Sequence, residues 1–201
     1  MLMPLRCRCG QVRGELDLAG AHARATCYCR DCQAFARFLG GDGLLDARGG
    51  TDVVASAPDA VRITAGIEQV ACMSMSPRGL LRWYAACCRT PLANTSRDAK
   101  LYYTGLVAAC LDAAPAAVDE ALGPRDRIVA NAGSATAPVE SSMLRFLAGG
   151  VRIFGPVIGA RLRGRRAGAP FFDAQGRPLR EPEVVSRERR QALQRGGPAG
   201  A

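Results

Sequence analysis

Residues 27–32 decide how this sequence is interpreted, because three cysteines stand within them: Cys27-Tyr28-Cys29-Arg30-Asp31-Cys32. One pair precedes this run in Cys7-Arg8-Cys9-Gly10, and another follows in Cys87-Cys88. Tight cysteine pairs beside a glycine or a turn are typical of zinc knuckles, where the turn lets sulfurs converge at about 2.3 Å on one tetrahedral ion. We therefore predict one or two zinc ions. The predicted ligands are Cys7, Cys9, Cys27, Cys29, Cys32, Cys87 and Cys88.

Other interpretations of these cysteines remain open. The thiols are also compatible with inert buried residues, with redox chemistry or with an iron–sulfur centre, although their spacing matches none of the usual ferredoxin patterns. Cys72 and Cys110 lie in apolar strand patterns, so we expect them to be buried as small hydrophobic residues. His22 is the only histidine and lies in a polar stretch, where a surface position is expected. Nucleophilic catalysis by a Ser-His or Cys-His pair therefore has little support.

Short apolar segments separated by glycine and proline turns surround the cysteine groups. Val61-Arg62-Ile63-Thr64 alternates apolar and polar residues, as a half-buried strand does. Ser76-Pro77-Arg78-Gly79 is a turn signal between two further strands. The pattern predicts a mainly β, antiparallel domain over residues 1–138.

The C-terminal third of the chain has a different pattern. One apolar stripe recurs at helical spacing through Met143, Leu147, Val151, Phe154, Ile158 and Leu162. This predicts an amphipathic helical extension over residues 139–170, kinked or broken at Gly149-Gly150 and Gly155-Pro156. Residues 171–201 are rich in arginine, glutamate, proline and glycine, and we expect a largely disordered basic tail.

Charge separates the same two parts of the chain. Residues 141–201 hold 12 arginines and 4 acidic residues, a net charge of +8, whereas residues 1–140 have a net charge of +1. Contact with an anionic partner would therefore involve the extension. We expect the apolar stripe to pack on the domain, and the alternative is a weak contact with a membrane surface through residues 140–166. Specific nucleic-acid binding is not expected, because basic and aromatic residues are not interleaved.

The N-terminal residues and the cysteine usage predict a cytoplasmic location. Met1 to Cys7 contains no apolar core of a secretory signal, and no uninterrupted apolar run reaches the roughly 18–20 residues of a membrane span. Nine cysteines in a reducing compartment indicate metal or redox chemistry more than a disulfide framework.

The order of the cysteine motifs resembles that of the glutathione-dependent formaldehyde-activating (GFA), CENP-V-like zinc-binding family, of which this chain would be a divergent member. The similar pieces are Cys7-Arg8-Cys9-Gly10, then Cys27 to Gln33 before a short helix, then Trp83 to Leu92, which ends in Thr-Pro-Leu. The resemblance covers roughly residues 4–110 and implies a tent of antiparallel β-sheets with two zinc positions. The structural zinc would use Cys7, Cys9 and the late cysteine turn.

The resemblance also implies an activity. The second zinc would be held by Cys27, Cys29 and Cys32, with an open position for a thiol adduct or water. The family is associated with glutathione adducts of formaldehyde and is classed with carbon–sulfur lyases, so glutathione or another small thiol adduct is the implied partner.

One departure from the family pattern affects the structural site. Where the family has two cysteines in a CxxCG turn, this chain has Ala85 and Cys88, and Arg89 replaces the glycine. Cys87 is an additional neighbour of Cys88. The site is rebuilt with Cys87, holds three thiolates and a water, or is lost, and we rank these alternatives in that order.

Two functions follow from these observations. In the first, the chain is an enzyme, a carbon–sulfur lyase whose zinc on Cys27, Cys29 and Cys32 polarises a thiol adduct. In the second, zinc is purely structural, and the basic extension of a binding module contacts a partner or a membrane surface. No general acid or base is evident in the sequence, so the sequence does not decide between them.

Overall fold

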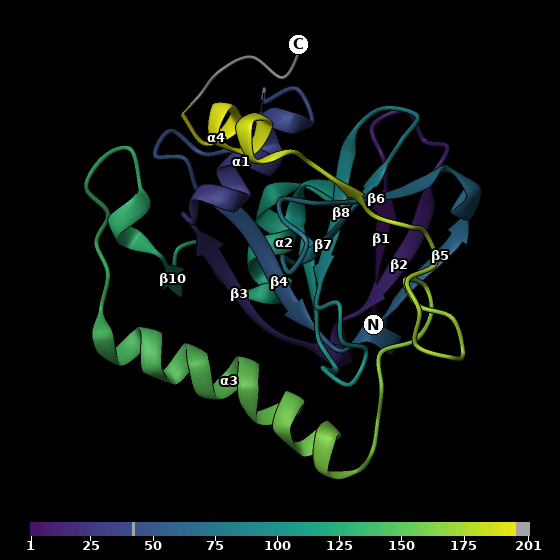
Figure 1. The fold of residues 1–201 in the computed structure, drawn as a ribbon. Coiled ribbons are helices and arrows are strands. Elements are labelled where there is room, and N and C mark those ends of the chain that lie inside the picture. Colours follow the sequence, from purple (N-terminus) through teal and green to yellow (C-terminus); the bar gives the residue numbers. More distant parts are fainter. Residues whose placement is uncertain (42, 196–201) are drawn as a thin grey trace.

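A computed structural model describes residues 1–41 and 43–195 of the chain as two β-sheets with four α-helices around them (Figure 1). The smaller sheet has the strand order β1-β2-β5 and the larger one the order β10-β3-β4-β9-β8-β7-β6-β11. The strands are β1 Leu2–Arg6, β2 Arg13–Asp17, β3 Ala21–Cys27, β4 Thr51–Ser56, β5 Val61–Ala65, β6 Val70–Ser74, β7 Leu81–Ala85, β8 Thr90–Thr95, β9 Thr104–Val107, β10 Val129–Ala130 and β11 Glu183–Val184.

The larger sheet is mixed. Its central pairs are antiparallel, as the turn-separated segments predict, but β10 pairs in parallel with β3 and β11 pairs in parallel with β6. Both parallel strands are two residues long and come from late segments of the chain that return to the sheet edges. The chain is therefore sheet-rich. The small sheet and the middle of the large sheet are antiparallel, and the parallel pairs of the described residues lie at the two edges of the large sheet.

The helices lie on different sides of the sheets. They are α1 Arg30–Phe38, α2 Pro115–Leu122, α3 Met143–Leu162 and α4 Arg187–Arg195. α1 and α4 lie beside each other above one end of the large sheet, whereas α3 runs along the opposite side of the molecule, next to β3 and β10 (Figure 1). Short 3₁₀ turns span Leu18–Gly20, Pro58–Ala60, Ile67–Gln69, Ala108–Cys110 and Ala132–Ser134.

The aromatic residues of the core tie the late segment to the sheet. Trp83 of β7 is fully buried, and its ring stacks on Phe171 with centroids 5.0 Å apart. Phe172 meets the same indole edge to face at 6.3 Å. The indole Nε1–H donates to the hydroxyl of Thr95, so the polar atom of this buried ring is paired.

The structure places packed elements within residues 171–195, a segment for which the sequence predicts a largely disordered tail. Phe171 and Phe172 are buried, β11 extends the large sheet, and α4 buries Leu193 against α1. A few apolar residues among many charged ones can hold such a segment in place, because they pack against the sheet and α1 of the folded domain. Composition averages over the segment and misses those few contacts. Residues 196–201 lie outside the described residues.

The helical extension also differs from the expectation. α3 continues through Gly149-Gly150 and Gly155-Pro156 as one helix of 20 residues. The predicted stripe does not pack on the domain: Met143, Leu147, Val151 and Ile158 are all more than half exposed. The buried side of the helix consists of Gly149, Val157 and Ala160. By length and composition alone, α3 is also long and apolar enough to cross a membrane, which the sequence expectation of no uninterrupted run did not foresee.

Candidate metal centres

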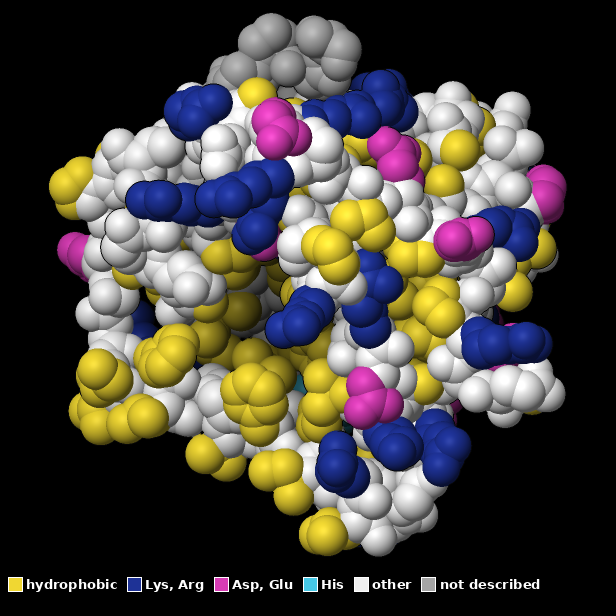
Figure 2. Space-filling view, in the orientation of Figure 1, with side chains coloured by type: hydrophobic (Ala, Val, Ile, Leu, Met, Phe, Trp, Pro, Cys, Tyr) yellow, Lys and Arg dark blue, Asp and Glu magenta, His cyan; other side chains and the backbone are white. Residues whose placement is uncertain are grey.

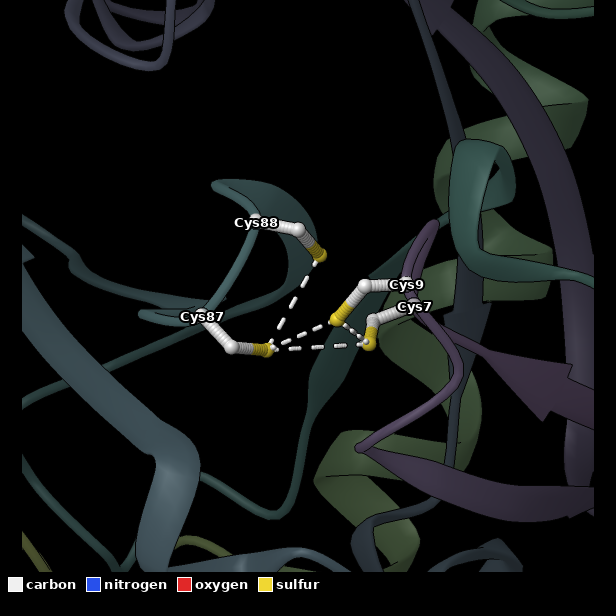
Figure 3. Close-up of side chains that lie close together, drawn as sticks. All are labelled: Cys7, Cys9, Cys87 and Cys88. Carbon is white, nitrogen blue, oxygen red and sulfur yellow. Dashed lines mark hydrogen bonds between the residues drawn. The ribbon is translucent and has the colours of Figure 1, made fainter.

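Four cysteine sulfurs meet between two turns that lie about 80 residues apart in the chain. Cys7 and Cys9 come from the β1–β2 turn, and Cys87 and Cys88 from the β7–β8 turn (Figure 3). We call this group the four-cysteine cluster. All four sulfurs lie within 4.8 Å of one another. The Sγ–Sγ distances are 3.6 Å for Cys7–Cys9, 3.8 Å for Cys7–Cys87, 3.3 Å for Cys9–Cys87 and 3.9 Å for Cys87–Cys88.

These distances fit a single metal ion. Sulfurs that lie about 2.3 Å from one tetrahedral ion are about 3.8 Å from each other. Disulfides need about 2.05 Å, so none of the four measured separations is a disulfide. The donor set and its spacing therefore suit one thiolate-bound ion.

Local backbone geometry explains why the first two sulfurs converge. Gly10 has a φ of 79°, a left-handed conformation that suits glycine, and its amide donates to the carbonyl of Cys7 at 2.8 Å. The amide of Val12 donates to the Cys7 sulfur at 3.2 Å. Backbone amides directed at a ligand sulfur are a feature of metal knuckles.

The second turn replaces the expected CxxCG geometry. Arg89 has a φ of 59°, and its amide donates to the carbonyl of Ala85 at 2.8 Å. Arg89, which stands where the family pattern has a glycine, thus adopts the left-handed conformation that glycine favours. Ala85 is buried in the core, and the sulfur of Cys87 lies with Cys7 and Cys9 instead. Of the three alternatives for this site, the geometry corresponds to the one rebuilt with Cys87.

Hydrogen bonds join the two turns and shift the pKa values of the cysteines in the second turn. The amide of Arg8 donates to the Thr90 hydroxyl at 2.9 Å, and its guanidinium donates to the carbonyl of Cys88 at 3.0 Å. Burial raises the pKa of Cys88, but hydrogen bonds from the Thr90 hydroxyl and nearby amides outweigh it and lower that pKa to about 6. The pKa of Cys87 is raised by burial and by its hydrogen bonds with Cys9 and Cys7. Of these two adjacent cysteines, Cys88 is therefore the one whose environment favours the thiolate form.

The three remaining predicted ligands form a second group, the three-cysteine cluster. Cys27 ends β3, Cys29 is the N-cap of α1, and Cys32 lies in the first turn of that helix. The Sγ atoms of Cys29 and Cys32 are 3.1 Å apart, and those of Cys32 and Cys27 are 3.7 Å apart. The fold thus gathers the seven predicted ligands into one group of four and one group of three.

The start of α1 favours negative charge on this group. The amide of Cys32 donates to the Cys29 sulfur at 3.3 Å, and the side-chain amide of Asn131 donates to Cys27 at 3.5 Å. Hydrogen bonds with Cys27 and then Cys32 lower the pKa of Cys29 to about 2, whereas those with Cys27 and Cys29, together with burial, raise the pKa of Cys32. The positive end of the helix dipole acts in the same direction on Cys29.

Arg82 is a component of this site that the sequence did not indicate. Its side chain is almost completely buried, and two of its nitrogens lie 3.8 and 3.9 Å from the Cys32 sulfur. The guanidinium also donates to Asn94 Oδ1 at 3.0 Å and lies 5.3 Å from the Phe35 ring centroid. A buried arginine requires a negative partner, and a thiolate in the three-cysteine cluster would supply one. No pattern in the sequence indicates this role.

The late helix α4 is joined to the cysteine-bearing loop. Arg190 forms an ion pair with Asp31 at 3.0 Å, and Gln194 donates to the same carboxylate at 2.7 Å. Arg37 of α1 donates to the carbonyl of Leu193 at 2.7 Å. The Asp31 carboxylate therefore holds α4 against α1. In the sequence, Asp31 lies between the predicted ligands Cys29 and Cys32.

The remaining cysteines and the histidine belong to neither group. Cys72 is 4% exposed and Cys110 is fully buried, as expected for small hydrophobic residues. Burial raises the pKa of each to about 12, so both stay as thiols. His22 is partly buried and lies outside both clusters, with a pKa lowered by burial.

Comparisons with known proteins place the chain in a family without giving it an activity. No curated protein matches this sequence. Among solved structures, the crystal structure of a Rhodobacter sphaeroides protein is 20% identical with a TM-score of 0.42, over 58% of this chain and 94% of that one. A family model matches residues 1–179, which is most of the sequence. The chain therefore belongs to DUF6151, a family of unknown function.

Proposed function

We propose that this protein binds two zinc ions, one in a closed structural site and one in a site that accepts an external ligand. The observation that supports this most strongly is the division of the clustered sulfurs into four and three. Four thiolates complete the tetrahedral coordination of zinc, whereas three leave one position for water or a substrate. All-thiolate sets favour soft or borderline ions such as zinc over magnesium or calcium.

The closed site would be formed by Cys7, Cys9, Cys87 and Cys88. It would join the β1–β2 turn to the β7–β8 turn, which connects the small sheet to the large one. Zinc bound there would contribute directly to folding free energy, because the ligands converge only in the folded chain.

The open site would be formed by Cys27, Cys29 and Cys32. Three thiolates and one zinc ion carry a net charge of −1, and the buried Arg82 guanidinium beside Cys32 offsets it. Zinc bound there would supply Lewis-acid polarisation to a fourth ligand. Arg82, Asn131 and the N-terminus of α1 hold the thiolates in place for that purpose.

Cobalt(II) tests the difference between the two sites. Full-length protein loaded with Co²⁺ in place of zinc is expected to hold two ions per chain and to show strong sulfur-to-cobalt absorption. Adding glutathione should change the spectrum of one ion only, because only the three-cysteine cluster has a free position. Cys29→Ser should remove one ion and the response to glutathione together.

The control is Cys72→Ala, which removes a buried thiol outside both clusters and should change neither the ion count nor the response. An unchanged spectrum on adding glutathione to the wild type would argue against the open site. So would a response that persists in Cys29→Ser.

A second candidate function is a carbon–sulfur lyase acting on thiol adducts of small aldehydes, within a GFA-like tent. Its support is the resemblance of the cysteine motifs together with the three-sulfur donor set. Zinc-loaded protein with glutathione and formaldehyde should then turn over faster than metal-free protein, and Cys29→Ser should abolish the difference. Equal rates in all three samples would argue against the lyase and favour a non-catalytic, zinc-stabilised binding module.

A further inference from the structure

The outward face of α3 is a continuous apolar surface. At 3.6 residues per turn, seven exposed apolar side chains fall within an arc of about 100°. They are Met143 (72% exposed), Leu144 (79%), Leu147 (57%), Val151 (73%), Phe154 (59%), Ile158 (58%) and Leu162 (83%). We call this set the α3 stripe, and Figure 2 shows its hydrophobic side chains along the lower edge of the molecule. A patch of this kind on a soluble domain usually marks an interaction site.

The opposite face of the same helix is fixed to the domain. Gly149 lies so close to Ile128 that an added Cβ would come within 2.8 Å of that side chain. Beyond the C-terminal end, Arg165 pairs with Asp59 at 2.6 Å and lies 4.4 Å from the ring centroid of Tyr102. The domain therefore holds α3 at Gly149, Val157 and Ala160 and beyond its C-terminal end, and displays the stripe outward.

The charges around the stripe are positive. From Met143 to Arg166 the chain contains six arginines and no acidic residue: Arg145, Arg152, Arg161, Arg163, Arg165 and Arg166. Arg145 and Arg152 also line an open cleft of about 1230 Å³ beside the helix, together with Arg48, Arg125 and Arg127. Asp126 and Glu140 lie on the same cleft, so basic residues outnumber acidic ones there.

We propose that α3 docks in the plane of an anionic lipid bilayer, with the stripe among the acyl chains and the arginines other than Arg165 at the headgroup phosphates. Apolar burial and attraction to anionic lipid together give stable attachment, whereas one of them alone is marginal. Charge favours this partner over a second copy of the chain, because pairing two stripes would bring two sets of arginines together. The fixed inner face favours a helix that lies on the membrane over one that crosses it.

Vesicle sedimentation with zinc-loaded full-length protein tests the proposal. The protein should sediment with vesicles of roughly equal parts phosphatidylcholine and phosphatidylglycerol, at least tenfold more strongly than with phosphatidylcholine alone. Raising the salt concentration should weaken the binding. Phe154→Glu, an exposed position in the middle of the stripe, should reduce binding to the mixed vesicles at least tenfold.

The matched control is Leu80→Glu, which places the same charge at another exposed leucine, in the β6–β7 turn. It should bind as the wild type does. Equal binding of Phe154→Glu and wild type would overturn the proposal, as would equal binding to neutral and mixed vesicles. A dimer in analytical ultracentrifugation that Phe154→Glu dissociates would assign the stripe to a second copy. Resistance to alkaline carbonate extraction would indicate a membrane-spanning helix and would also overturn it.

Discussion

Replacing Cys9 by serine is expected to remove one zinc ion per chain and to lower the free energy of unfolding by about 4 kcal/mol or more. Cys9 is exposed, and its sulfur lies 3.3 Å from that of Cys87. Substitutions of exposed side chains usually change stability by less than about 0.5 kcal/mol, whereas loss of a metal is one of the few causes of larger effects. Denaturant unfolding with elemental analysis measures both quantities.

The position of Cys9 makes this variant informative. If the cluster held no ion, Cys9→Ser would be nearly neutral, because no buried contact is lost. Gln11→Ser serves as the control, since it changes another exposed residue near the same turn and should keep both ions and the stability of the wild type. Metal-free wild type and metal-free Cys9→Ser should have the same stability. A stable Cys9→Ser protein that keeps its zinc would contradict the structural site.

Arg82→Met is expected to weaken zinc binding at the three-cysteine cluster by roughly 10–100-fold, the range found for partners that support metal ligands. The substitution keeps most of the side-chain volume but removes the positive charge 3.8 Å from the Cys32 sulfur. It also leaves Asn94 Oδ1 without its guanidinium donor. Competition with a chromophoric chelator measures the affinity of each ion.

Arg82→Lys separates charge from packing. The lysine keeps the positive charge, so its affinity should lie between those of Arg82→Met and the wild type. Arg62→Met is the surface control: Arg62 is largely exposed and pairs with Glu15 at 3.3 Å, and such pairs contribute little. Wild-type affinity in Arg82→Met would show that the guanidinium does not support the cluster.

The clusters illustrate what the sequence could indicate. Cysteine pairs beside turns can be recognised in the sequence, because this spacing is typical of metal knuckles. Ala85 stands where the family pattern has a cysteine, and spacing alone left open whether Cys87 replaces that ligand. The answer depended on the direction of a turn whose left-handed residue is Arg89. Arg82 could not be foreseen, because a sequence does not tell which buried face of a strand meets a helix from elsewhere in the chain.

In the fold too, local sequence patterns indicate some elements and not others. The strands around tight turns and the helix over Pro115–Leu122 follow from local patterns. The sequence pattern does not indicate β8, because Pro91 interrupts it. The register of the β7–β8 pair shifts between Trp83 and Tyr84, beside the proline, and the strand tolerates the proline at this irregularity. The sequence pattern does not indicate β10 and β11 either, because two-residue strands carry no periodic signal.

The side of α3 that packs was predicted wrongly for a physical reason. Periodicity identifies the more apolar side of a helix, and that side usually faces the core. Here the core side is formed by Gly149, Val157 and Ala160, whose small side chains permit a close approach. The larger apolar residues are left outward, and only the tertiary structure reveals this.

Zinc content of the purified full-length chain tests the central claim most directly. The claim is that the turns of β1–β2 and β7–β8 form one metal site and that the start of α1 forms another. Elemental analysis of protein expressed with adequate zinc is expected to find two zinc ions per chain, and one in either Cys9→Ser or Cys29→Ser. A wild-type protein that folds stably and contains neither zinc nor another thiolate-bound metal would contradict it.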